Sequence, residues 1–347
     1  MVYIADLWVP AVWAQALHEP QATYSALFTS GVVARNPIHD ALATGAGTTV
    51  NVPFFSDISD QADQIQVEAT APADNGQPGG VMVAPVFNRV TKNSVGAMAK
   101  QITGTDPLQQ IITWLYTRRL KQRQATTLSI LRGLFGSAGA VNGAACMAAN
   151  RLGGTVNEPF SENGAAALSN QLFSPDLFIF AKALMGENEN LLANGALWIH
   201  PNVLARLEQL DALNFKTLIK SSELPFTIRT YRDIPIFLSS NLVRAGTQSG
   251  FVYETYLLAP GVIAYGEKLQ MGDVTDVASL QYWRNRDLNE ELIWDYTRHV
   301  QHVLGTKWVG NPAGQSATNA ELATPGNWQY LFQTTSRVPA VCIRTNG

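Results

Sequence analysis

Four side chains in the C-terminal part of the chain have the types and spacing of a metal site. Glu291, Asp295, His299 and His302 lie in the segment EELIWDYTRHVQH. On a helix they would share one face, and two carboxylates with two imidazoles form a ligand set suited to a divalent transition metal. The secondary structure of this segment therefore decides whether it supports metal or acid–base chemistry.

The same segment also alternates between apolar and polar residues, as a strand does. The apolar positions are Leu292, Trp294, Tyr296 and Val300, and the polar positions between them are Asp295, Thr297, His299 and Gln301. Trp, Tyr, Thr and Val favour strands, so we prefer the strand, in which His299 and His302 point to opposite faces. We therefore expect no catalytic, cofactor-binding or metal-binding residue, and a strand with a solvated or interfacial polar face.

A second group of candidates is a basic cluster near the middle of the chain. Its members are Arg118, Arg119, Lys121, Arg123 and Arg132. Three roles are open for them: the solvated face of a long helix, ion pairs with carboxylates of a neighbouring chain, and non-specific proximity to DNA phosphates.

The basic cluster belongs to a predicted helix over residues 106–136. Asp106 is a natural N-cap, Pro107 suits the first helical position, and Gly136 suits a left-handed helix end. The apolar stripe is Leu108, Ile111, Ile112, Leu115, Leu128, Leu131 and Phe135. At 1.5 Å per residue this helix would be about 45 Å long, which is typical of a strut.

Other motifs exclude several kinds of site. The glycine-rich stretch 133–139 follows a helix and lacks the spacing of a phosphate or dinucleotide loop, so it predicts a helix stop. Cys146 and Cys342 belong to no metal or redox motif, which suggests a reducing compartment without disulfides.

The bulk composition describes a folded protein with little charge. The chain has 347 residues, 46% of them hydrophobic and 15% charged, and a net charge of −3. This balance argues against a dedicated nucleic-acid binder and favours association with other chains. No signal peptide and no apolar run long enough to span a membrane is apparent, so we expect synthesis as a soluble protein.

The N-terminal third of the chain is predicted to form two extended segments. Residues 1–47 predict an arm with Trp8 and Trp13 as apolar anchors, and residues 48–100 predict a long β-hairpin or extended loop. Pro53 either confines the strand Thr48–Phe55 to an edge or marks its end. Because an isolated two-stranded ribbon is marginal in water, we expect it to lie on a partner. Removing residues 60–90 should then leave the body folded but unable to assemble.

Residues 171–270 predict a compact α+β subdomain, with helices at Ser174–Met185 and Pro201–Leu213 and strands up to Val262–Gly266. The remaining residues, 271–347, return to extended structure, with strands near Leu288–Val303 and Gln329–Arg344.

This order of parts, together with local text, resembles a known family. The segments that carry the resemblance are the Asp-Pro helix start, RDIPIFLSSNL at 232–242, APGVIAYGE at 259–267, RHVQHVLGTKW at 298–308 and VPAVCIRTNG at 338–347. They look like the major capsid proteins of tailed bacteriophages, which have the Hong Kong 97-type fold. The resemblance covers essentially the whole chain.

The resemblance implies an α+β fold with five parts. Residues 1–47 would be the N-terminal arm and 48–100 the extended loop. Residues 101–170, with the spine helix 106–136, would begin the peripheral domain, 171–270 would form the axial domain, and 271–347 would complete the peripheral domain.

The resemblance also implies a function without catalysis. The chain would assemble through hexamers and pentamers into an icosahedral shell around double-stranded DNA. It would be made in the host cytoplasm and end in the virion. Its partners would be copies of itself, a separate scaffolding protein, a portal, optional decoration proteins and the packaged DNA, with no membrane and no cofactor. Two alternatives stay open: a soluble metal-dependent enzyme using the His299/His302 region, and a tail or sheath protein.

Overall fold

The computed structural model shows two sheets and the helices around them. It describes residues 30–45, 47–56, 65, 76, 79–96, 107–136, 146–153, 171–217, 229–245, 250–268, 280–285, 287–332 and 334–347. The predicted anchors Trp8 and Trp13 and the predicted cap Asp106 lie outside these residues, so their roles stay predictions.

The first sheet draws its strands from both halves of the chain. They are β1 (Val33–Arg35), β2 (Thr49–Phe55), β3 (Gly79–Gly96), β11 (Ile263–Glu267), β12 (Leu280–Asn285), β13 (Glu290–Val303), β14 (Thr306–Trp308) and β15 (Trp328–Tyr330). Their order is β1-β11-β13-β3-β14-β15, with β12 added to β13 and β2 added to β3.

The second sheet is built mainly from the middle of the chain and closed by its end. Its strands are β4 (Arg151–Leu152), β5 (Ala196–Ile199), β6 (Phe215–Thr217), β7 (Arg229–Tyr231), β8 (Ile234–Leu238), β9 (Val243–Ala245), β10 (Phe251–Leu258) and β16 (Ala340–Thr345). Their order is β4-β16-β10-β5-β8-β7-β6, with β9 added to β10.

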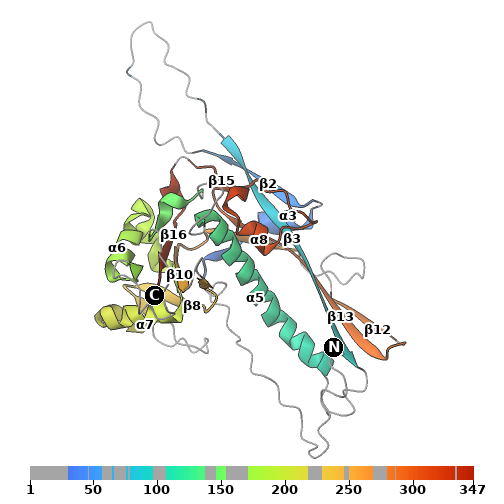
Figure 1. The fold of residues 1–347 in the computed structure, drawn as a ribbon. Coiled ribbons are helices and arrows are strands. Elements are labelled where there is room, and N and C mark those ends of the chain that lie inside the picture. Colours follow the sequence, from blue (N-terminus) through green and yellow to red (C-terminus); the bar gives the residue numbers. More distant parts are fainter. Residues whose placement is uncertain are drawn as a thin grey trace, which may run out of the picture.

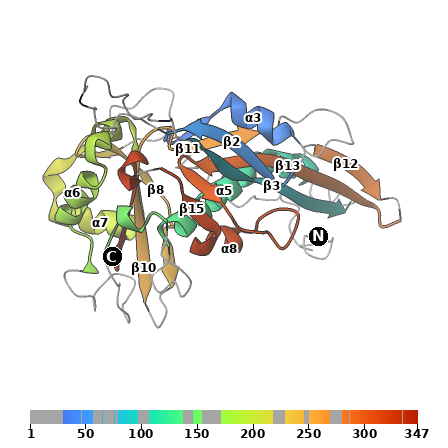
Figure 2. The same ribbon diagram turned by 90° about the horizontal axis from the view of Figure 1, so that it is seen from above.

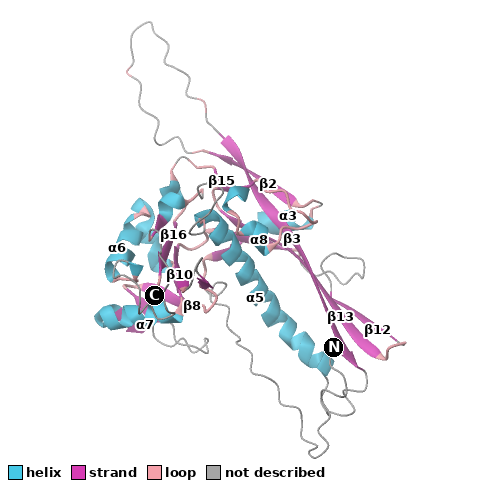
Figure 3. Ribbon diagram, in the orientation of Figure 1, coloured by secondary structure: helices cyan, strands magenta, loops and turns pink. Residues whose placement is uncertain are grey.

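The two sheets stand side by side, and the long helix α5 (Pro107–Phe135) runs along the first sheet toward the second (Figures 1 and 2). Figure 3 shows helices gathered around the second sheet, including α6 (Pro175–Ala183) and α7 (Pro201–Leu210). The predicted α+β class is therefore confirmed.

Helix α5 lies where the sequence predicts it. Gly136 follows its last residue with φ +75°, the left-handed conformation expected at a helix end. The stripe residues Leu128, Leu131 and Phe135 are buried. Gly133 permits close packing against α8 (Asn319–Leu322), because a Cβ there would lie 2.1 Å from the Leu322 carbonyl oxygen.

Strands β2 and β3 pair as predicted, but β3 is not part of an isolated ribbon. The β2–β3 register runs from Thr49↔Pro85 to Phe55↔Gly79, and β2, which carries Pro53, is an edge strand among those described. The rest of β3 pairs with β13, from Val86↔Val300 to Gly96↔Glu290. Val86 and Phe87 are buried in the body. The expectation that residues 60–90 are removable is therefore wrong for residues 79–90.

The first sheet is sandwiched between α5 and the short helix α3 (Pro37–Thr44). On one face of β13, Arg298 Nε donates to the Ala43 carbonyl oxygen of α3 at 2.8 Å. On the other face, Gln301 Nε2 donates to the Arg123 carbonyl oxygen of α5 at 3.3 Å. Because successive strand residues point to opposite faces, β13 contacts both helices, one on each face of the sheet.

The predicted helices around the second sheet are confirmed, but the range 171–270 does not match the sheet. Ser174 caps α6 by accepting from the Leu177 N–H, as expected. However, β4 and β16 join this sheet from outside the range, whereas β11 lies inside the range and belongs to the first sheet. The chain crosses between sheets at Gly261, whose φ is +72°. The predicted strand Gln329–Arg344 is likewise two strands, β15 and β16, in different sheets.

One apolar cluster joins both sheets to the C-terminal half of α5. It includes Leu131 and Leu134 of α5, Val303 of β13, and Tyr256 and Leu258 of β10. A second cluster packs α6 and α7 on the other face of the second sheet. The shared first cluster fixes the two sheets relative to α5.

Candidate functional site

The segment considered for metal binding is a strand, as predicted. β13 spans Glu290–Val303, so Asp295 and His299 face α5, whereas His302 faces α3. Within the described part of the chain, no group of three or more His, Cys, Asp or Glu side chains is placed to hold a metal ion. The expected solvated or interfacial polar face is wrong, because Asp295, His299 and Gln301 are buried beneath α5.

His299 packs against aromatic rings below α5. Its ring centroid is 5.2 Å from that of Phe87 and 6.2 Å from that of Tyr265. Burial, reinforced by the charges of Arg123 and Arg89, lowers the pKa of His299 to about 3. The imidazole is therefore neutral at pH 7, and neither ring nitrogen has a hydrogen-bond partner among the described residues.

His302 and His39 form a buried pair on the opposite face. Their rings stack with centroids 6.1 Å apart. His302 Nε2 lies 2.9 Å from the Thr306 carbonyl oxygen, which requires the proton on Nε2. Burial lowers the pKa of His39 and lowers that of His302 to about 4. These imidazoles are packing groups at pH 7.

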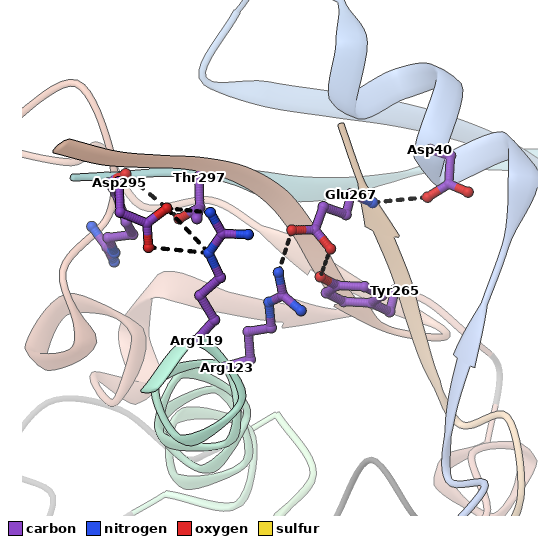
Figure 4. Close-up of polar contacts among 8 residues, drawn as sticks. Asp40, Arg119, Arg123, Tyr265, Glu267, Asp295 and Thr297 are labelled. Atoms are coloured by element: carbon purple, nitrogen blue, oxygen red, sulfur yellow. Dashed lines mark hydrogen bonds and ion pairs between the residues drawn. The ribbon is translucent and has the colours of Figure 1, made fainter. Parts of the chain in front are cut away.

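Arg119 reaches from α5 to Asp295 on β13 (Figure 4). Its Nε lies 3.1 Å and 3.0 Å from the two carboxylate oxygens, and its Nη2 donates to Oδ1. Asp295 has 3% of its side chain exposed and Arg119 23%. The hydrogen bond to Asp295 raises the pKa of Arg119. This two-point contact fixes the position of α5 over β13.

Arg123 connects α5 to β11 and, through it, to α3. Its guanidinium pairs with Glu267, whose other oxygen accepts from the Tyr265 hydroxyl at 2.8 Å. The Glu267 N–H in turn donates to Asp40 Oδ1 at 2.8 Å. Figure 4 shows this relay crossing the sheet from one helix to the other.

Arg132 belongs to a more deeply buried cluster at the other end of α5. Its Nε donates to Glu254 Oε2 on β10 at 2.6 Å. The second oxygen of Glu254 faces Arg244 at 3.1 Å and Arg344 at 3.8 Å. Glu254 and Arg344 are buried, and Arg132 and Arg244 keep 21% and 23% of their side chains exposed, so one buried carboxylate binds three guanidinium groups.

The predicted basic cluster thus divides in two. Arg119, Arg123 and Arg132 pair with carboxylates of the same chain, a role that is absent from the three considered above. Arg118 donates to the Thr91 hydroxyl of β3, and Lys121 is exposed. Contacts of this cluster with a neighbouring chain or with DNA stay a prediction.

Sequence reasoning missed the acidic partners. Glu254 and Glu267 lie in apolar strands, FVYETYLL and IAYGE, where a lone glutamate signals a paired buried carboxylate. That signal identifies the residue but gives no partner, because Arg132 is 122 positions from Glu254.

Large apolar side chains are exposed at several places, among them β12 and α6. On β12, Tyr282 and Trp283 are 55% and 65% exposed. On α6, Ile179 and Phe180 are 44% and 61% exposed. Exposed apolar groups of this size commonly mark contact surfaces.

Two further features concern the reactivity of a cysteine and the possibility of a membrane-spanning helix. Burial raises the pKa of the Cys342 thiol to about 12, so this cysteine is not a nucleophile at neutral pH. No helix in the described residues is both long and apolar enough to cross a lipid bilayer.

Comparison with known proteins finds a relative that covers most of the chain. No protein-family model matches. The major capsid protein of Bacillus phage SPP1 is 24% identical over 342 residues, which cover 95% of this chain and 94% of that protein.

Several solved structures from phages have a similar fold. The capsid of Ralstonia phage GP4 has a TM-score of 0.57 at 11% identity, covering 100% of this chain and 98% of that one. The cyanophage Pam1 capsid has a TM-score of 0.54 at 10% identity, with the same coverage. A chain of Microbacterium phage Oxtober96 has a TM-score of 0.51 at 8% identity and covers 98% of this chain.

The structural likenesses establish the fold, and the SPP1 protein adds a sequence relationship over the same length. The ion pairs described above are structural, since Arg119, Arg123 and Arg132 of α5 each pair with a carboxylate of the same chain. The chain therefore has the Hong Kong 97-type fold of tailed-phage capsids and is similar along nearly its whole length to a phage major capsid protein.

Proposed function

We propose that the chain is the structural subunit of an icosahedral head shell that encloses the double-stranded DNA of a tailed phage. The observation that carries this proposal is the relationship to the SPP1 major capsid protein over 95% of the chain. An enzymatic role finds no support in the described residues, because Asp295 is paired with Arg119 and the two histidines lie on opposite faces of β13.

The two sheets suggest how the parts of the subunit divide. We assign the first sheet with α5 to the peripheral domain and the second sheet to the axial domain. Residues 1–47 would be the arm, and the extended loop would start from the β2–β3 pair within 48–100. Since β16 joins the second sheet, residues 271–347 would complete both domains and not the peripheral domain alone.

Self-association into hexamers and pentamers is the central part of the proposal. The charged fraction of 15% and the exposed Trp283 and Phe180 fit a subunit that is covered by other copies. A separate scaffolding protein, a portal and decoration proteins would be further partners, with non-specific proximity to packaged DNA. The chain would be made in the host cytoplasm and end in the virion.

Size-exclusion chromatography with negative-stain imaging of the expressed full chain tests the proposal. Closed icosahedral shells, or rings of five or six subunits, are expected. A small monodisperse monomer under all conditions would overturn it, and tubes would favour the tail or sheath alternative.

A deletion between β2 and β3 tests the proposed loop. Replacing residues 56–78 with Asn-Gly keeps the pairing Phe55↔Gly79 and supplies a tight hairpin turn. The subunit should remain folded by circular dichroism but form no shells. As a control, a variant with residues 56–78 in scrambled order retains the length. Normal shells from the deletion variant would contradict the role of the loop.

A further inference from the structure

A pocket of about 340 Å³ lies where α5 crosses β3 and β13. Four arginines line it: Arg89 from β3, and Arg118, Arg119 and Arg123 from α5. Arg119 and Arg123 are neutralised by Asp295 and Glu267, as Figure 4 shows. The charge of the pocket therefore depends on the other two guanidinium groups.

Arg89 is held by neutral groups. It donates to the Ser316 hydroxyl at 3.3 Å and to the Ala317 carbonyl oxygen. Glu321 is the nearest acidic influence, but its carboxylate already accepts from Thr318 and from the Ala313 N–H. Burial lowers the pKa of Arg89, which shows that the charge of this guanidinium is poorly solvated.

Arg118, on the α5 side of the pocket, also has only a neutral partner. Its contact is with the Thr91 hydroxyl, another neutral group. Among the described residues, no carboxylate lies within ion-pair distance of Arg118 or Arg89. Two positive charges thus share one recess without a counter-charge, an arrangement that costs free energy unless an anion enters.

The remaining lining supplies neutral hydrogen-bonding groups. Gln122, Thr126 and Asn319 line the recess, and so does His299. His299 is 4% exposed, and neither of its ring nitrogens has a partner in the described part of the chain. A buried polar ring without a partner at the wall of a cationic recess points to a ligand with oxygen atoms.

We propose that this pocket binds a phosphate group between Arg89 and Arg118. Guanidinium groups bind phosphate oxygens through paired N–H donors, and a phosphate dianion would balance both charges. The recess between a helix and a sheet admits a small group but not the backbone of a DNA duplex. The phosphate is therefore a free ion or the exposed phosphate of a short single strand. Binding ties β3 to α5 and does not depend on shell assembly.

Isothermal titration calorimetry of the full chain with inorganic phosphate tests the proposal, with sodium chloride of equal ionic strength as reference. Binding to the unaltered chain is expected. Arg118→Gln removes one charged hydrogen-bond donor and breaks no ion pair. The affinity of this variant for phosphate should therefore be at least about tenfold lower than that of the unaltered chain. Gln122→Glu places a negative charge at the exposed lip and should weaken binding without touching the core. Arg284→Gln, an equal charge change on exposed β12, should bind like the unaltered chain.

The outcomes separate the sources of the ligand. Competition by a short single-stranded oligonucleotide would identify a nucleic-acid phosphate, and its absence a free ion; both support the proposal. No phosphate binding beyond the chloride reference, or equal binding by Arg118→Gln and Gln122→Glu, would overturn it. Binding of the acidic peptide 56–78 in place of phosphate would also overturn it and make the pocket a carboxylate site. Because these measurements need no shells, they stay informative if assembly fails.

Discussion

The two ends of α5 are attached to the molecule in different ways. At the C-terminal end, Leu131, Leu134 and Phe135 are fully buried, and Arg132 joins the interior cluster around Glu254. Toward the N-terminal end, arginines lie over a polar face of β13 beside a pocket. Burial fixes the first end, whereas charge and hydrogen bonds orient the second.

The largest expected effect is at Glu254. Glu254→Gln leaves Arg132, Arg244 and Arg344 without their shared carboxylate in a buried site. Removing one partner of a buried charge cluster costs about 3–5 kcal/mol. The free energy of unfolding from urea titration measures this loss.

The matched control for this change is Glu208→Gln. Glu208 pairs with Arg229 at the surface, where the side chains are 39% and 59% exposed, so its loss should cost at most about 1 kcal/mol. Equal costs for Glu254→Gln and Glu208→Gln would show that burial does not strengthen the Glu254 cluster at the C-terminal end of α5.

A smaller effect is expected at Asp295, below the N-terminal half of α5. Asp295→Asn weakens the two-point contact with Arg119, which retains 23% exposure and so recovers part of its hydration. The expected cost is about 1–3 kcal/mol. A double-mutant cycle with Arg119→Gln measures the coupling directly. A coupling energy of zero would show that packing, not this pair, places α5 over β13.

The sequence predicted α5 to within one residue at each end, because its signals are local. Pro107, Gly136 and the stripe at Leu128 and Leu131 all lie inside or next to the helix they define. The alternation in β13 predicted a strand from local signals in the same way, and the structure has a strand there.

The partners across the structure were not predictable in the same way. Arg119 and Asp295 are 176 positions apart, and β3 finds β13 across a similar separation. An alternating pattern states which residues share a face, but gives no information on whether that face meets solvent or a helix. The polar face of β13 therefore appeared solvated in the sequence and is buried in the fold. The sequence placed the strands on both sides of Gly261 in one subdomain, but they belong to different sheets. A tight turn in the sequence does not reveal that the chain changes sheets.

The acid sensitivity of the face beneath α5 gives the next prediction. His299 has a folded-state pKa of about 3, below the ordinary value of about 6.5. The unfolded chain therefore binds a proton between these values that the folded chain does not. The contribution of His299 to stability is constant above pH 6.5 and falls by about 1.4 kcal/mol per pH unit below it, or roughly 2 kcal/mol at pH 5, in addition to the losses from His302 and His39.

His299→Phe should remove this part of the pH dependence, since a phenyl ring suits the site between Phe87 and Tyr265. Urea titrations between pH 5 and 7 measure the slope. Phe87→Leu disturbs the same packing without a titrating group and should keep the slope. An unchanged slope in His299→Phe would show that the ring is hydrated and not packed.

The smallest expected effect is at Gly136, which ends α5 at its buried end. Gly136→Ala forces a Cβ into a left-handed backbone at φ +75°, at a cost of about 1 kcal/mol. Gly314→Ala is the matched control, since a Cβ at Gly314 meets no atom within 4 Å, and its unfolding free energy should change by less than about 0.5 kcal/mol. If Gly136→Ala cost as much as Glu254→Gln, the turn and not the buried cluster would fix this end of α5. If Gly136→Ala lowers the unfolding free energy by only about 1 kcal/mol, burial of side chains fixes this end of α5, and Gly136 contributes only the left-handed turn that ends the helix.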